Sequence, residues 1–144
     1  GSHLQILHVL ITAQAEVNEA GKNGDFPVHV ASRKGKEDLL CLLLAAEASV
    51  DCLSRSGKSP VSIALKEGHE AVLRLLLHAK ADGNIHGKCS LAPVLIACVR
   101  ENVTAIRLLL RAQAASDTSD VNDLSACSCV SLHGHVQLLC ELLR

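Results

Sequence analysis

The residues with the clearest capacity for chemistry lie near the end of the chain, where two cysteines and two histidines fall within nine positions: Cys127, Cys129, His133 and His135. Thiolate and imidazole groups are ligands that zinc favours in proteins. Cys129 and His133 are four residues apart, so on a helix they share one face. The spacing of the four residues nevertheless differs from that of structural zinc sites. A metal-binding or redox-sensing array built on the seven cysteines therefore stands as an alternative function.

Other reactive groups are isolated from one another. Cys89 follows Lys88, whose charge can lower the pKa of a thiol, although an inert surface cysteine fits equally well. The segment Asn102-Val103-Thr104 matches a glycosylation acceptor but falls within a predicted helix, so we discount it. The sequence contains no phosphate-binding Gly-rich loop, nucleophile elbow or pair of catalytic carboxylates. It therefore predicts neither an enzyme nor a cofactor.

Composition limits the partners and the compartment. The net charge is −1, and with one aromatic residue there is little on which bases could stack, so we expect no nucleic-acid binding. No apolar run has the ~18 residues that a membrane-spanning helix needs. The odd number of cysteines favours reduced thiols, and hence an intracellular, cytoplasmic or nuclear, protein. We expect Gly1-Ser2-His3 to be the remnant of an expression tag and the natural chain to extend further.

The elements that must position any functional residue repeat along the chain. A shift of 33 residues aligns the sequence with itself without a gap: Pro27, Pro60 and Pro93 fall in register, as do Ala31, Ala64 and Ala97. The triplet Leu42-Leu43-Leu44 recurs at Leu75-Leu76-Leu77 and Leu108-Leu109-Leu110. Each unit predicts a first helix that begins at the proline, a turn, a leucine-rich second helix and a projecting loop. A repeat at a fixed period predicts an all-α solenoid of stacked units.

The repeat also offers an explanation of the Cys/His cluster without metal. Cys127 and Cys129 stand in the register of Val28 and Val30, which are predicted core positions. Small buried thiols behave as apolar side chains. We therefore favour a structural role for these cysteines, and assign no metal ligand.

Several short motifs identify the fold more closely. Phe26-Pro27-Val28-His29, Ser59-Pro60-Val61-Ser62 and Ala92-Pro93-Val94-Leu95 resemble the Thr-Pro-Leu-His motif of the ankyrin repeat family, and Gly68-His69 and Gly134-His135 resemble its Gly-His link. The resemblance covers residues 4–144. It implies helix-turn-helix units with hairpin-like loops: 4–20 (partial), 21–53, 54–86, 87–119 and 120–144 (truncated). It further implies that His29 and His69 are buried, hydrogen-bonded histidines, and that the chain binds proteins.

Two departures from the family pattern bear on rigidity. The family places Gly in a left-handed conformation after the second helix, where this chain has Gln14, Glu47, Lys80 and Gln113. Either the helices end differently or the array tolerates strain of roughly 1 kcal/mol at each place. The family's Thr-to-His hydrogen bond is missing, since Phe26 stands where Thr belongs before His29. We expect an array that is less rigid than a consensus one.

The resemblance also predicts a binding face, made of the loop tips and the ends of the first helices. Carrying the family's variable positions over by register gives the partner-binding residues Lys22, Asp25, Arg33, Lys34, Arg55, Lys58, Lys66, Lys88, Leu91, Val99, Arg100, Leu124 and Leu132. Eight of the chain's 14 basic residues fall among the variable positions. We therefore infer an acidic peptide or acidic protein face as the partner, with apolar contacts at Leu91, Val99, Val121, Leu124 and Leu132. The alternative is that these lysines and arginines only solvate the surface.

Overall fold

A proline sets the start of each first helix. The computed structural model describes residues 5, 16–85 and 92–112, and it places Pro27, Pro60 and Pro93 at the first position of α2 (Pro27–Lys34), α4 (Pro60–Glu67) and α6 (Pro93–Val99). Proline is favourable there because the first N–H groups of a helix have no partner within the helix. Ser59 adds a side-chain cap to α4 by accepting a hydrogen bond from the Ser62 N–H.

Each first helix is followed by a second helix after a short turn. The second helices are α3 (Glu37–Ala45), α5 (Glu70–His78) and α7 (Val103–Arg111). The turns after α2 and α4 pass through Gly35 and Gly68, which have φ values of 63° and 79°. A glycine adopts this left-handed conformation without the cost that a Cβ imposes.

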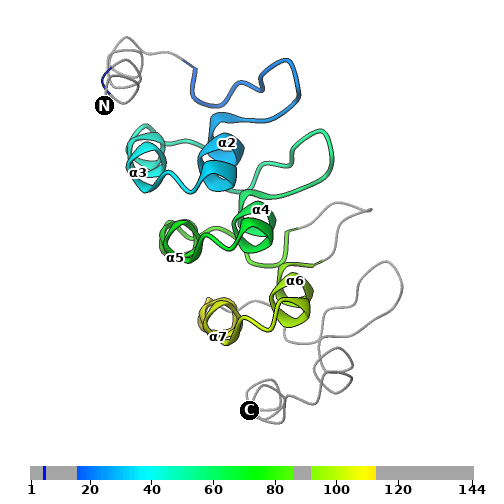
Figure 1. The fold of residues 1–144 in the computed structure, drawn as a ribbon. Helices are drawn as coiled ribbons and strands as arrows, with labels where there is room; N and C mark the ends of the chain where they lie inside the picture. The colour runs from blue at the N-terminus through cyan, green and yellow to red at the C-terminus, as the bar shows by residue number, and fades with distance from the viewer. Residues whose placement is uncertain (1–4, 6–15, 86–91, 113–144) are drawn as a thin grey trace.

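The helices form two rows that run side by side along the array (Figure 1). In one row α2, α4 and α6 pack against one another in turn, and in the other α3 contacts α5 and α5 contacts α7. Each first helix also packs against its own second helix, so every unit is one layer of a stack. The described residues contain helices and loops but no strand, which confirms the prediction of an all-α solenoid.

The core consists of small and aliphatic side chains, repeated from layer to layer. Ala31, Ala64 and Ala97 are fully buried in the first helices, and Leu43, Leu76 and Leu109 are fully buried in the second helices. Alanine lets neighbouring helices approach closely, and leucine fills the space between the two rows. This arrangement explains how a sequence with one aromatic residue forms a continuous core.

The projecting loops are held by short hydrogen bonds that repeat at the same register. In the loop before α2, Gly21 donates to the Asp25 carbonyl, and in the loop before α4 Ser54 donates to the Lys58 carbonyl. The two loops are joined where the Arg55 N–H donates to the Gly24 carbonyl at 3.1 Å. A Cβ on Gly24 would lie 2.5 Å from the Cβ of Arg55, so this close approach requires glycine.

A second repeated link joins the ends of consecutive units. The Asn18 side-chain oxygen accepts from the Ser49 N–H at 2.7 Å, and 33 residues later the Asp51 carboxylate accepts from the Asp82 N–H at 2.8 Å. Both links run from a side chain of one unit to the backbone of the next. They fix the position at which each loop leaves its second helix.

The places after α3 and α5 show that the array tolerates backbone strain. Glu47 and Lys80 have φ values of 57° and 63°, so these helices end as they would with glycine. Gln14 and Gln113 lie outside the described residues. Glu101 also has a positive φ, 55°, at the register position of Gly35 and Gly68. The sequence analysis did not predict strain at this position.

Candidate functional site

The predicted binding face combines the ends of the first helices with the loops that precede them. Arg33 and Lys34 lie in the last turn of α2, Lys66 in the last turn of α4, and Val99 is the last residue of α6. These side chains are exposed, as are Lys22 and Arg55 in the loops and Arg100 after α6. Asp25 and Lys58 are half-buried. The remaining predicted partner contacts lie outside the described residues: Lys88, Leu91, Val121, Leu124 and Leu132.

One ion pair organises the first part of this face. The Arg33 guanidinium donates to the Asp25 carboxylate at 2.7 Å, with side chains that are 41% and 21% exposed respectively. The hydrogen bond from Arg33 lowers the pKa of Asp25, and the positive charges of Arg33 and Lys58 lower it further. The same contact raises the pKa of Arg33. The sequence analysis placed both residues on the face but did not predict that they are paired.

The pairing changes the charge that a partner would meet. Among the described positions of the face, seven side chains are basic and Asp25 is acidic, and a second acidic residue, Glu67, follows Lys66 at the end of α4. Asp25 is engaged by Arg33, so part of the positive charge is balanced within the protein. The face still carries an excess of positive charge, which favours association with acidic segments and makes it sensitive to salt.

A purely structural explanation exists for some of these charges. Arg33 and Lys34 at the end of α2, and Lys66 at the end of α4, lie where the helix dipole is negative. A positive side chain in the last turn stabilises a helix by about 0.3–1 kcal/mol. The loop residues Lys22 and Arg55 have no such role, because they lie outside helices. A charge reversal on the face, matched by one at the ends of second helices such as Arg111 in the last turn of α7, can therefore separate binding from helix stability.

His29 lies directly beneath this face and is fully buried. Its Nδ1 accepts from the Phe26 N–H at 3.1 Å, so Nε2 carries the proton and donates to the Cys52 carbonyl at 3.2 Å. The backbone of Phe26 therefore gives the His29 ring a hydrogen-bond partner although no Thr side chain is present. Burial lowers the pKa of His29. A neutral histidine with both nitrogens engaged has a structural role, as predicted.

His69 serves the junction between units and is only half-buried, which corrects the expectation of a buried residue. Its Nε2 lies 3.1 Å from the Arg33 carbonyl of the preceding unit. A Cβ added to Gly35 would lie 2.6 Å from the same ring. The glycine is therefore needed for close packing as well as for its left-handed conformation.

The described cysteines show no sign of reactivity. Cys98 is buried, Cys52 is half-buried with its pKa raised by burial, and Cys41 is exposed on α3. A reactive thiol needs a lowered pKa. Within the described residues no three His, Cys, Asp or Glu side chains gather as metal ligands would. Cys89 and the cluster of Cys127, Cys129, His133 and His135 lie outside them.

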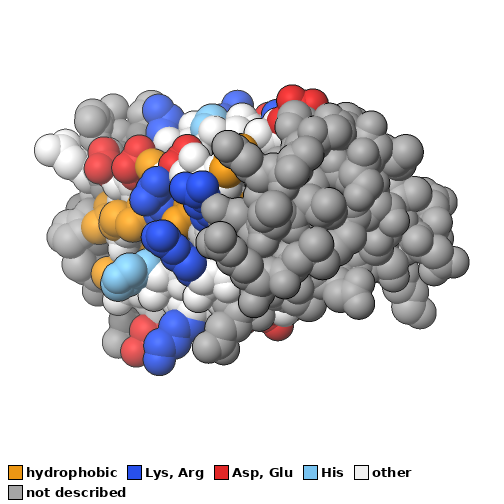
Figure 2. Space-filling view, turned by 90° about the horizontal axis from the view of Figure 1, so that it is seen from below, with side chains coloured by type: hydrophobic (Ala, Val, Ile, Leu, Met, Phe, Trp, Pro, Cys, Tyr) orange, Lys and Arg blue, Asp and Glu red, His pale blue; other side chains and the backbone are white. Residues whose placement is uncertain are grey.

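A second group of basic residues lies on the second helices and was missed by the sequence analysis. Arg74 and Arg107 stand in the same register on α5 and α7, and Arg111 ends α7; all three are exposed. Arg74 is paired with Glu70 at 2.7 Å. Figure 2, which views the array from the end nearest α7, shows Lys and Arg side chains gathered on the described surface. The 33-residue register could have identified this group.

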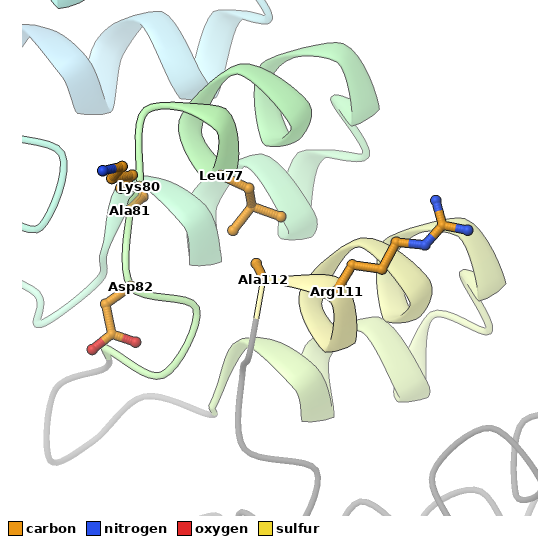
Figure 3. Close-up of a pocket in the computed structure, with 6 residues that line it drawn as sticks. All are labelled: Leu77, Lys80, Ala81, Asp82, Arg111 and Ala112. Carbon is orange, nitrogen blue, oxygen red and sulfur yellow. The ribbon is translucent and has the colours of Figure 1, made fainter. Parts of the chain in front are cut away.

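A hollow of about 530 Å³ opens between the ends of α5 and α7. Leu77 and Ala112 lie on either side of its middle, whereas the charged ends of Lys80 and Arg111 extend away from it (Figure 3). A small-molecule site needs polar groups that converge on one point. The hollow lacks that convergence, and it lies on the second-helix side, away from the predicted binding face.

The comparisons with known proteins agree with the repeat that the structure shows. A family model described as ankyrin repeats (3 copies) matches residues 1–87, which is more than half of the chain. No curated protein matches the chain. In the part of the chain that the structure describes, every helix is too short or too polar to cross a bilayer.

Proposed function

The chain belongs to the ankyrin repeat family, and we propose that its loop tips and first-helix ends bind an acidic segment of another protein. Ankyrin repeats are generally protein–protein interaction modules and are typically not enzymes. The observation that carries the proposal is the excess of exposed basic side chains along one face, over three consecutive units. We propose further that it acts inside the cell, in the cytoplasm or nucleus.

The geometry of the face supports a partner that runs along the stack. Arg33 and Lys66 occupy one register position on α2 and α4, and Lys34 and Arg100 occupy the next position in the first and third units, with Glu67 between them. Because the first helices lie side by side, equivalent positions form rows along the array (Figure 1). A segment with regularly spaced carboxylates would meet a positive charge in successive units.

The ion pair between Arg33 and Asp25 supports the same proposal. A guanidinium held by a carboxylate loses less freedom when it binds a second acceptor, so less binding energy is spent on ordering it. Arg33 keeps further N–H donors besides the one that reaches Asp25. Within the described residues no cluster of metal ligands favours the alternative of a metal-binding or redox-sensing array, and burial raises the pKa of the Cys52 thiol.

The test compares charge reversal on two faces. Lys34→Glu with Lys66→Glu changes the predicted face, and Lys80→Glu with Arg111→Glu applies the same charge change to the second-helix side. The probe is an octaglutamate peptide, with the dissociation constant measured by calorimetry at low and high salt. We expect the first pair to weaken binding by at least about tenfold and the second to have a small effect. Equal losses, or affinity that is indifferent to salt, would show that the face is not specific.

A further inference from the structure

The turn between α6 and α7 departs from the two preceding turns in three ways. Val99 is 52% exposed at the register position of Arg33 and Lys66. Val103 is 40% exposed at the position of Glu37 and Glu70. Glu101 has a φ of 55° where the earlier turns have glycine. The third turn therefore exposes two valines and holds a non-glycine residue in a left-handed conformation.

None of these departures improves the local structure. An acidic residue in the first turn stabilises a helix, and α3 and α5 have one whereas α7 has none. The exposed part of a valine side chain contributes no stabilisation through burial. A positive φ is unfavourable for Glu. Places where a sequence breaks its own local pattern without a packing gain are expected to be functional.

The turn is nevertheless well fixed, so the two valines are presented in a defined way. The Glu101 N–H donates to the Cys98 carbonyl at 2.9 Å, and the Asn102 N–H donates to the Ala97 carbonyl at 3.0 Å. The Asn102 side chain accepts from the Ala105 N–H at 2.9 Å and so caps α7. Val99 ends α6 and Val103 begins α7, so both lie at the same end of this helix pair.

The surroundings of the turn indicate what would cover it. Arg100 adjoins Val99 and stands at the register position of Lys34, and the preceding units carry Arg33 and Lys66 at the position of Val99 itself. An apolar site at the end of a positive surface is complementary to a segment that combines acidic and apolar side chains. Contacts of this kind contribute affinity, while the surrounding charges align the partner.

We propose that Val99 and Val103 form the apolar anchoring site of the acidic segment bound by this array, receiving an aliphatic side chain such as leucine. This inference rests on the proposed function and adds to it the position and the chemical nature of the main contact. It distinguishes the third unit from the first two, in which the equivalent positions carry charges.

The experiment uses two probes, the octaglutamate peptide and the same peptide with two leucines inserted, titrated into the whole chain. The leucine peptide should bind about tenfold more tightly, which is the gain expected from burying about one leucine side chain. Val99→Ser with Val103→Ser should remove that gain, so that the variant binds the two peptides with equal affinity. Val30→Ser with Leu53→Ser is the matched control, since these residues are each 41% exposed elsewhere in the array. The exposure of Val30 corrects the prediction that it is a core position.

The outcomes separate the inference from the proposed function. If both peptides bind equally and salt weakens both, the acidic partner stands and the anchoring site is wrong. A leucine gain that survives in the double serine variant also overturns the site. If neither peptide binds, the acidic partner is wrong and the anchoring site falls with it. Loss of self-association in the double serine variant, measured by light scattering, would assign the valines to contacts between copies and overturn the proposal.

Discussion

The junction between the first two described units and the junction between the second and third have the same geometry but different chemistry. At the first junction His69 lies over Gly35 and its ring reaches the Arg33 carbonyl. At the second junction Asn102 stands at the register position of His69, and its side chain caps α7. A Cβ on Gly68 would meet nothing within 4 Å. The first junction is therefore closed by a histidine, and the second is open at the equivalent point.

The starts of the first helices show the same progression from polar to apolar. In α2, His29 bonds the backbone at both nitrogens, and in α4 Ser59 and Ser62 form a buried pair joined at 3.0 Å. In α6, Leu95 occupies this position and is buried. All three helices still pack in one row (Figure 1). The aliphatic core thus sets the layered arrangement, and the polar positions determine how specifically each layer is held.

The largest expected effect tests the shared core. Leu43→Ala and Leu76→Ala remove equivalent, fully buried side chains from α3 and α5. Each should lower the free energy of unfolding by about 2–5 kcal/mol, because each leaves a cavity between the two helix rows. Chemical denaturation measures both values. A small loss at one position and a large loss at the other would contradict a core that is equivalent from layer to layer.

The next largest expected effect is a loss of stability that differs between the two junctions. Gly35→Ala would place its Cβ 2.6 Å from the His69 ring at a φ of 63°, whereas Gly68→Ala is strained only by its φ of 79°. We expect losses of about 2–4 and about 1 kcal/mol respectively. Adding His69→Ala should restore part of the loss in the Gly35→Ala chain. Equal losses at the two glycines would show that the histidine does not close the first junction.

Of the polar side chains that cap the starts of α2 and α4, His29 is titratable and Ser59 and Ser62 are not. We therefore expect α2 to contribute more than α4 to the pH dependence of stability. Burial lowers the pKa of His29 below its ordinary value of 6.5, so the unfolded chain binds the proton first as the pH falls. The stability contributed by neutral His29 is complete above that value and is lost as the pH falls through it toward the lower folded pKa. Protonation would also remove the acceptor for the Phe26 N–H.

A variant taken from the chain itself tests this assignment. Phe26→Ser with His29→Ser gives α2 the Ser59–Ser62 arrangement of α4, which has no titratable group. The unfolding free energy of the variant should depend less steeply on pH than that of the original chain between about pH 7 and 5. Identical slopes would mean that other histidines cause the pH dependence.

The smallest effect concerns the three non-glycine residues with positive φ in the described part of the chain. Glycine at Glu47, Lys80 or Glu101 would relieve a positive φ, although it also increases the freedom of the unfolded chain. Each substitution should raise the unfolding free energy by about 0.5 kcal/mol. Thermal denaturation of the three variants measures this gain. A loss at Glu101 alone would mean that its side chain stabilises the turn between α6 and α7.

Much of the fold could be predicted from the sequence because the repeat is periodic and its marks have local causes. Proline at a helix start, glycine at a turn and leucine on a buried face each act within a few residues. The strain at Glu47 and Lys80 followed from the missing glycines. The pair between Arg33 and Asp25 could not be predicted in this way, since it depends on side-chain positions in the folded turn.

The central claim is that the loop tips and first-helix ends, and not the second helices, form the binding face. Its most direct test is a titration of the chain with octaglutamate, followed by backbone amide chemical shifts. The account predicts that the largest shifts cluster at Arg33, Lys34, Lys66 and Arg100. Shifts concentrated at Arg74, Arg107 and Arg111 on the second helices would contradict it.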